Sequence, residues 1–193
     1  MIEAFENAKR ALEVFMADGR NITTLEQAAD LLAESLAEGG KILACGNGGS
    51  ACDAMHFCEE LTGRYRQDRS PLAAISLTDP GHLTCVANDY GFEEVFVRGV
   101  RALGRQGDVL VALSTSGNSP NIVRATEAAT ELGLRTIGLL GKDGGSLAGA
   151  CDLEWIVPGV PAHAPTADRI QEIHMLILHT LVEGIEHRLF GSS

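Results

Sequence analysis

The sequence predicts an α/β fold in which helices cover both faces of a parallel sheet. Short apolar runs alternate with segments of helical periodicity along most of the chain. The runs contain few polar residues, as expected for strands that are covered on both faces. Two turns rich in glycine and serine each follow an apolar run and precede a helical segment. This position places both turns at the carboxyl edge of the sheet, where such folds bind ligands.

Size and composition favour one globular domain over residues 1–193, because 45% of the side chains are hydrophobic. No apolar stretch approaches the ~18 residues that cross a bilayer, and no signal peptide is recognised. The 5 cysteines lack Cys-x-x-Cys spacing, which favours buried, reduced thiols. We therefore expect a cytoplasmic protein without a membrane partner. The formal net charge of -11 argues against a nucleic acid partner, since binding to phosphates needs clustered cations.

The N-terminal region predicts two amphipathic helices. Helical periodicity extends over residues 2–18 and is interrupted at Gly19–Asn21. Thr23 precedes Glu26 by three residues, which is the pattern of a capping box at the start of a second helix. We expect these helices to form a hairpin over residues 1–38 that packs against a partner subunit in an oligomer.

The rest of the chain alternates between predicted strands and helices. The predicted strands cover residues 41–45, 72–76, 108–113, 134–140 and 152–157. The predicted helices cover residues 50–62, 80–88, 92–103, 120–132 and 167–189. Alternation of this kind implies right-handed crossovers and a parallel sheet.

The first turn, Cys45–Ser50, has the composition of an anion site. Its glycines allow the backbone to approach a ligand closely, and the helix that follows presents unpaired N–H groups. The Ser50 hydroxyl adds a further donor. The turn lacks the spacing of a dinucleotide fingerprint, and no Gly-Lys-Ser/Thr of a phosphate-binding P-loop follows. A tight turn that simply requires glycine is the alternative interpretation.

The second turn, Ser114–Ser119, repeats this arrangement after another predicted strand. Ser119 alone is also explained as a helix N-cap before Pro120. Capping accounts for one serine and leaves Ser114 and Ser116 unexplained. Two such turns in one chain predict a phosphorylated ligand held at the edge of the sheet.

The helix after the first turn carries Asp53, His56 and Glu60. His56 and Glu60 are four residues apart and therefore lie on one face. Such a pair can bind a divalent metal or share a proton. An ordinary surface pair is the alternative, but the position beside the first turn favours a functional role.

The C-terminal helix contains Gln171, His174 and His179. Gln171 and His179 are eight residues apart, which is about 12 Å along a helix axis. One metal ion can hardly bind both from a straight helix, so their side chains must lean together or come from different subunits. A lone helix histidine is usually structural, and chemistry alone does not identify His179. Asp89, after Asn88, is either a sugar-hydroxyl ligand or a turn residue.

Five stretches together resemble the phosphoheptose isomerases, a family of the sugar isomerase (SIS) domain superfamily: CGNGGSACDAMHFCEELTGR, STSGNS, TCVANDYGF, GKDGG and ADRIQEIH. The resemblance covers about Met1 to Phe190. It implies the three-layer SIS fold, with a five-stranded parallel sheet flanked by helices, and a homotetramer with active sites between subunits. It also implies an aldose–ketose isomerase that converts sedoheptulose 7-phosphate to D-glycero-D-manno-heptose 7-phosphate. That reaction begins nucleotide-heptose synthesis for lipopolysaccharide core or other surface glycans.

The resemblance also implies roles for individual residues. The substrate-binding positions of the family fall on Asn47, Gly48, Gly49, Ser50, Asn88, Asp89, Ser114, Thr115, Ser116, Ser119 and Gln171. The acid/base pair falls on Glu60 and His179, and zinc ligands of some members fall on His56, Glu60, Gln171 and His179. Some relatives have histidine where this chain has Ala51, so one accessory polar contact is not expected here.

The implied mechanism moves one proton between carbons and another between oxygens through a cis-enediol. We assign Glu60 to the carbon proton and His179 to the oxygen proton, although the two roles can be exchanged. A zinc ion would polarise the carbonyl. The alternative function is a non-catalytic SIS adaptor that binds the replication initiator protein. That adaptor shares the CGNGGS and RIQE motifs, but this chain keeps Glu60 and His179, which favours catalysis.

Overall fold

The computed structural model describes residues 1–158 and 166–191. The described residues form one five-stranded parallel sheet in the order β2-β1-β3-β4-β5. The strands are β1 (Ile42–Gly46), β2 (Ala74–Ser76), β3 (Val109–Ser114), β4 (Arg135–Gly141) and β5 (Leu153–Val157). Each predicted strand is confirmed, with ends that differ by at most two residues.

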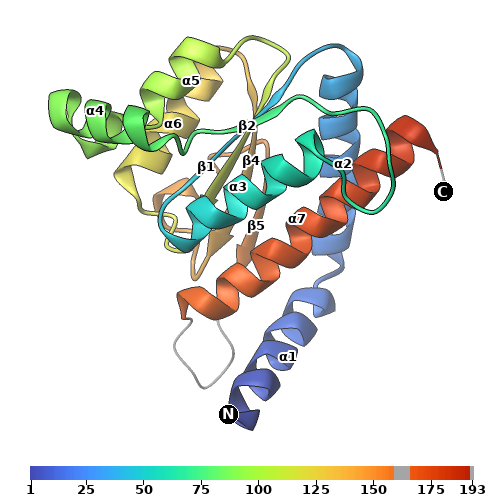
Figure 1. Ribbon diagram of the computed structural model, residues 1–193. Helices are drawn as coiled ribbons and strands as arrows, with labels where there is room; N and C mark the ends of the chain where they lie inside the picture. The colour runs from blue at the N-terminus through green and yellow to red at the C-terminus, as the bar shows by residue number, and fades with distance from the viewer. Residues whose placement is uncertain (159–165, 192–193) are drawn as a thin grey trace.

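Helices cover both faces of this sheet (Figure 1). They are α1 (Ile2–Ala17), α2 (Gly19–Ala37), α3 (Gly49–Thr62), α4 (Pro80–Tyr90), α5 (Val97–Leu103), α6 (Pro120–Glu131) and α7 (Ala167–Phe190), with 3-10 turns η1 (Phe92–Glu94) and η2 (Gly145–Leu147). Side chains from α1, α2, α3 and α7 form one core cluster, and those from α4, α5 and α6 form the other. Successive residues of β1 alternate between the two clusters, which confirms a three-layer fold. No helix in the described ranges is long and apolar enough to span a bilayer.

The prediction for the start of the second helix was wrong. Asp18 is the N-cap, and its carboxylate accepts a hydrogen bond from the Arg20 N–H at 3.0 Å. Thr23 lies inside α2, where its hydroxyl donates to the Gly19 carbonyl. A carboxylate cap with extended backbone at Asp18 therefore competes successfully with the capping box at Thr23.

The N-terminal helical pair is confirmed, but it is not folded back as a hairpin. Figure 1 shows α1 and α2 following one another with a bend, and both helices pack against α7. Phe15 of α1 is buried, whereas Ile2 and Phe5 at its start are exposed. The described chain therefore leaves apolar side chains of α1 uncovered.

The predicted single helix over residues 92–103 was also wrong, because η1 and α5 are separate. The ring of His82 makes a hydrogen bond with the Val95 carbonyl at 3.0 Å, which takes this acceptor away from a continuous helix. The cysteine prediction holds in part. Each of the five cysteines is free, but Cys52 and Cys85 are exposed rather than buried.

The long helix α7 lies beside α3 across one face of the sheet (Figure 1). Its predicted apolar stripe, which includes Ile173 and Ile177, is buried in the first core cluster. Gly184 allows α2 to approach α7 closely, because a Cβ at this position would lie 2.8 Å from the Cβ of Ala29. This packing fixes α7 against the sheet and brings its polar residues beside α3.

Candidate active site

The two predicted anion turns lie next to each other at the centre of the sheet. Strands β1 and β3 are neighbours, and Gly46 pairs in register with Leu113 at their carboxyl ends. From β1 the chain crosses to β2 on one side, and from β3 it crosses to β4 on the other. Open α/β sheets of this strand order bind ligands in the crevice at such a switch point.

The first turn has backbone geometry that favours glycine. Gly48 has φ 56 and ψ -121, a conformation that residues with a Cβ rarely adopt. The Ser50 N–H donates to the Asn47 carbonyl at 3.1 Å, which closes the turn, and the Ser50 side chain is buried. The N-terminus of α3, which starts at Gly49, is therefore presented at this edge of the sheet.

The second turn is held by its own hydroxyl groups. The Gly117 N–H donates to the Ser114 hydroxyl at 3.1 Å, and the Asn118 N–H donates to the Ser116 hydroxyl at 3.2 Å. Ser119 occupies the N-cap position of α6, but within the described residues its side chain makes no capping hydrogen bond. Its hydroxyl instead lies 3.5 Å from that of Ser114. Capping by the Ser119 side chain is therefore not the interpretation that the structure supports.

The GKDGG stretch and the two residues that follow it support this second turn from outside. The Leu147 N–H donates to the Gly117 carbonyl at 3.1 Å, and the Ser146 N–H donates to the Asn118 side chain at 2.9 Å. Gly117 has φ +63 and lies directly against Gly144, so a side chain has no room there. The Thr115 carbonyl lies close to Gly141, because a Cβ at position 141 would be only 2.7 Å from that oxygen.

Two asparagines join the turns. The amide group of Asn47 and that of Asn121, at the start of α6, donate to each other in two hydrogen bonds of 2.9 Å. Asn121 is buried. This contact was not predicted, since 74 residues separate the two positions and each motif was considered alone. The Asn47 side chain is thus used to fix the turn.

Three of the predicted metal or acid/base residues meet beside α3 and α7 of one chain. The Nε2 atoms of His56 and His179 are 3.0 Å apart, and the Nε2 atom of His56 is 3.4 Å from the Oε1 atom of Glu60. One ligand atom from each of the three residues lies within 4.8 Å of the other two. The imidazole and carboxylate donors of this cluster suit Zn²⁺, which commonly binds two histidines and one glutamate.

The environment of the cluster orients its rings. The Glu60 side chain is only 15% exposed, whereas that of His56 is 39% exposed. The Nδ1 atom of His56 lies 3.3 Å from the carboxylate of Glu59, a contact that fixes which ring nitrogen faces the cluster. The ring of Tyr65 lies 5.7 Å from that of His179. Tyr65 was not predicted, because its loop carries no recognisable motif.

Gln171 lies against the first turn. Its Nε2 atom is 3.4 Å from the Ser50 hydroxyl, and a Cβ on Gly49 would lie 2.5 Å from that nitrogen. His179 lies about two helical turns further along the same continuous helix. Of the four predicted zinc ligands, three are clustered, and Gln171 lies instead against the first turn.

Asp53 lies on the same face of α3, between the first turn and His56. Its Oδ2 atom is buried and has no hydrogen-bond partner in the described part of the chain. Burial raises the pKa of this carboxyl group, and the neighbouring His56 opposes the shift.

Asn88 and Asp89 are not brought to this cluster by their own chain. Both are exposed on α4, which projects from the side of the fold away from α7 (Figure 1). The Asn88 amide donates to the Asp89 carboxylate at 2.7 Å. Their predicted contact with substrate stays a prediction.

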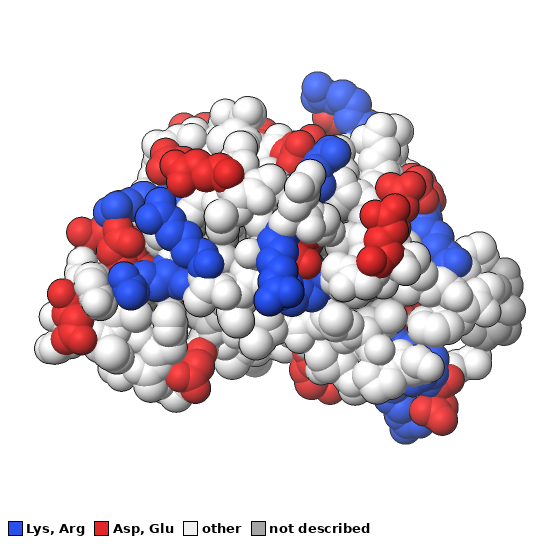
Figure 2. Space-filling view, turned by 90° about the horizontal axis from the view of Figure 1, so that it is seen from above, with Lys and Arg blue, Asp and Glu red and all other residues white. Residues whose placement is uncertain are grey.

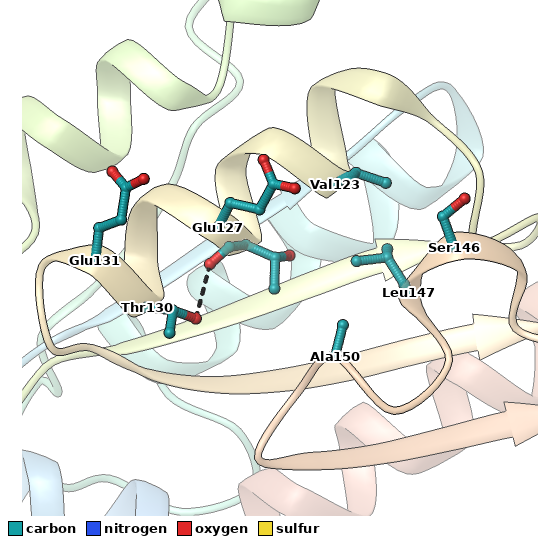
Figure 3. Close-up of a pocket in the computed structure, with 8 residues that line it drawn as sticks. Val123, Glu127, Thr130, Glu131, Ser146, Leu147 and Ala150 are labelled. Carbon is teal, nitrogen blue, oxygen red and sulfur yellow. Dashed lines mark hydrogen bonds between the residues drawn. The ribbon is translucent and has the colours of Figure 1, made fainter.

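Another pocket lies between α6 and the segment after β4 (Figure 3). It has a volume of 340 Å³, and the side chains of Glu127 and Glu131 are part of its lining. Carboxylates repel a phosphate, and none of the predicted site residues lines this pocket. It therefore does not compete with the two turns at the carboxyl edge of the sheet as a candidate anion site.

Comparison with known proteins agrees with this geometry. A family model of the SIS domain matches residues 5–141. The chain is 52% identical over 190 residues to a phosphoheptose isomerase of Fusobacterium nucleatum, with 98% of this chain and 95% of that one covered. It is 53% identical over 182 residues to a phosphoheptose isomerase of Vibrio cholerae, covering 94% and 93% of the two chains.

Solved structures give the same result. The phosphoheptose isomerase of Neisseria gonorrhoeae superposes with a TM-score of 0.87 at 44% identity and covers 96% of each chain. That of Francisella tularensis gives 0.88 at 38% identity, covering 96% of this chain and 95% of that one. These values confirm both the predicted SIS fold and the predicted relationship. The chain belongs to the phosphoheptose isomerase family of SIS-domain proteins.

Proposed function

We propose that this protein converts sedoheptulose 7-phosphate to D-glycero-D-manno-heptose 7-phosphate. The observation that carries the proposal is the meeting of Glu60 and His179 within one chain, on the helices α3 and α7 whose N-terminal parts reach the first anion turn. A carboxylate and an imidazole at this distance can serve the two proton transfers of an aldose–ketose isomerisation. The relatives named above are isomerases, and the adaptor alternative finds no support among them.

The two turns are the proposed seat of the phosphate. Helices α3 and α6 both begin at these turns. The unpaired N–H groups and the dipoles of the two helix N-termini therefore favour a dianion there. Ser50, Ser114, Ser116 and Ser119 supply hydroxyl donors. Because the phosphate is remote from the reacting carbons, its binding energy serves to hold the sugar in place for proton transfer.

Glu60 is the proposed base for the carbon proton. Its carboxylate projects from α3 into a largely buried position, where few water molecules compete for it. His179 approaches from α7 and would carry the proton between the two oxygens. The sugar would lie with its phosphate at the turns and its first two carbons at this pair. His56 would then help to fix both groups by its contacts at 3.0 and 3.4 Å.

A zinc ion fits the same residues. His56, Glu60 and His179 would hold it, with Gln171 as the fourth predicted ligand, and a bound zinc ion would polarise the substrate carbonyl. Glu60 and His179 would be both zinc ligands and acid/base groups. Each can accept a proton only while it is not bound to zinc, so zinc occupancy would limit its acid/base role.

We also propose that the protein is a cytoplasmic homotetramer with active sites between subunits and that residues 1–193 form a single SIS domain. The exposed Ile2 and Phe5 support a role of the N-terminal helices in oligomerisation, since buried apolar contacts stabilise such interfaces. Asn88 and Asp89 would then complete the site of a neighbouring subunit. The product would supply nucleotide-activated heptose for lipopolysaccharide or other surface glycans.

We expect no nucleic acid partner. Figure 2 shows the basic side chains of the face seen from above in separate groups, with acidic side chains close to them. This distribution and the net charge of -11 are unfavourable for binding a phosphate backbone.

The test is an NMR assay of sedoheptulose 7-phosphate with the wild-type protein and with the variants Glu60→Gln and His179→Gln. We expect the wild type to form the aldose phosphate and both variants to lose most of the turnover while still binding substrate. Glu127→Gln, an exposed glutamate on α6 away from the cluster, is the matched control and should behave as the wild type. Absence of conversion by the wild type, together with tight binding to the replication initiator protein, would instead favour the adaptor.

A further inference from the structure

We infer that Arg69 is a positioning residue that holds the end of α3, with Glu60, at a fixed place against α7. This inference deepens the proposed function and rests on it. Arg69 lies in the loop between α3 and β2, outside all the motifs discussed above. Its side chain is only 6% exposed, which is unusual for an arginine and requires that its charge and donors be satisfied within the protein.

One side of the guanidinium group binds the carboxyl end of α3. Nη2 donates to the backbone carbonyl of Glu60 at 2.7 Å, and Nη1 donates to the carbonyls of Leu61 at 2.7 Å and Gly63 at 3.1 Å. The last carbonyls of a helix have no partner within the helix, and a cation at this end is favourable. Arg69 thus caps the turn that carries the proposed base, through a direct bond to the backbone of that residue.

The other side of the same group binds α7. The Nε atom donates to the carboxylate of Glu186 at 2.9 Å, and the Glu186 side chain is 18% exposed. Glu186 follows His179 by seven residues, so both side chains leave the same side of α7. The planar guanidinium therefore joins the segment that carries Glu60 to the segment that carries His179.

This arrangement requires arginine. Its fork of N–H donors points in fixed directions, so one side can serve the carbonyls of α3 while the other serves a carboxylate. A lysine ammonium in the same place is a single point charge and cannot span both groups with the same geometry. The Leu72 N–H also donates to the Leu61 carbonyl at 3.0 Å, which fixes the loop beyond Arg69 to the same helix end.

The consequence concerns chemistry more than substrate affinity. The phosphate turns lie at the opposite end of α3, so loosening its last turn should disturb Glu60 and leave the phosphate seat intact. A displacement of a reacting group by about 1 Å can cost about 100-fold in rate. A purely structural ion pair would instead lower stability and leave the turnover of the folded protein unchanged.

Arg66 provides a matched control. It lies three residues earlier in the same loop and forms an ion pair with Glu183 of α7, but its side chain is 66% exposed. Within the described part of the chain, Arg66 makes no hydrogen bond to the carbonyls of α3. Arg66→Gln removes a positive charge, an ion pair to α7 and the contact of the guanidinium with the Tyr65 ring, whereas Arg69→Gln removes a positive charge, an ion pair to α7 and the cap of α3.

The experiment compares kcat, KM and thermal unfolding of the full-length wild type, Arg69→Gln, Arg69→Lys, Glu186→Gln and Arg66→Gln at a temperature where all are folded. We expect Arg69→Gln to lower kcat by about 10- to 100-fold with KM within about twofold. Arg69→Lys should recover part of the loss, Glu186→Gln should show a smaller loss, and Arg66→Gln should match the wild type. A folded Arg69→Gln variant with wild-type kcat, or with a change in KM alone, would overturn the inference.

A second readout does not depend on catalysis. Arg69→Gln should speed amide hydrogen exchange in the last turn of α3, including the Gly63 N–H, while exchange in α6 stays unchanged. If the wild type has no isomerase activity, the proposed function fails, and this exchange measurement still decides whether Arg69 holds the helix end. Unchanged exchange at Gly63 would refute that role in either case.

Discussion

Acidification should weaken this protein through one buried histidine. His174 of α7 is fully buried, and its Nε2 atom lies 2.9 Å from the Leu140 carbonyl at the end of β4. A ring nitrogen beside a carbonyl must carry the proton, so Nε2 is the donor. Within the described residues the Nδ1 atom is buried without a partner, which makes a second proton there costly. Burial lowers the pKa of His174 from 6.5 to about 4.

The sign and the size of this pH effect on stability follow from proton linkage. Between about pH 6.5 and pH 4 the unfolded chain binds a proton at His174 that the folded chain excludes. The unfolding free energy is therefore unaffected by His174 above that range, and it decreases as the pH falls through the range. The pKa shift of His174 corresponds to about 3 kcal/mol of unfolding free energy in total, of which about 2 kcal/mol is lost between pH 7 and pH 5.

The assay is urea-induced unfolding of the wild type and of His174→Gln at pH 7 and pH 5. The amide nitrogen of glutamine can take the place of Nε2 toward Leu140 but does not titrate. Between the two pH values the wild type should therefore lose about 2 kcal/mol more unfolding free energy than the variant. Equal losses in both proteins would refute the reasoning, whatever the stability of the variant at pH 7.

Three further predictions concern the candidate site. Asn121→Asp places a carboxylate against the side-chain amide oxygen of Asn47 and beside the two anion turns, so the KM for the sugar phosphate should rise by about tenfold or more with little change in kcat; steady-state kinetics with an unchanged KM would contradict this. Gly49→Ala should weaken competitive inhibition by inorganic phosphate, because its Cβ would meet Gln171, and the loss should be smaller in a Gln171→Ala background; equal losses in both backgrounds would exclude this clash. Elemental analysis after zinc loading should find about one zinc per wild-type chain and a clear loss in His56→Ala, and an equal zinc content in both would exclude His56 as a ligand.

Much of the fold could be predicted from the sequence because its strands are buried on both faces. Unbroken apolar runs mark such strands clearly, and all five were placed within two residues. Helix starts depend on single capping contacts, and two patterns competed near the bend between α1 and α2. The carboxylate of Asp18 caps α2 five residues before Thr23, the N-cap that the capping box implies. The direction of α1 is set by packing on α7, which no local pattern reveals.

Part of the candidate site could likewise be predicted from local sequence patterns, and part could not. The glycine- and serine-rich turns and the His56/Glu60 spacing were visible locally, whereas His179 was identified only through the resemblance to the family. The contact between Asn47 and Asn121 joins two motifs and could not be derived from either alone. Arg69 had no signal at all, because its loop is charged and resembles an ordinary solvated segment. Such contacts depend on the relative placement of whole elements.

The central claim is that one chain supplies both Glu60 and His179 to the same bound sugar phosphate. Subunit mixing tests it most directly: inactive Glu60→Gln and inactive His179→Gln proteins are unfolded and refolded together, and mixed oligomers are verified by native mass spectrometry. If each site takes both groups from one chain, every site keeps one defect and the mixture stays inactive. Recovery of about a quarter of the wild-type turnover, as expected when different subunits supply the two groups, would contradict the account.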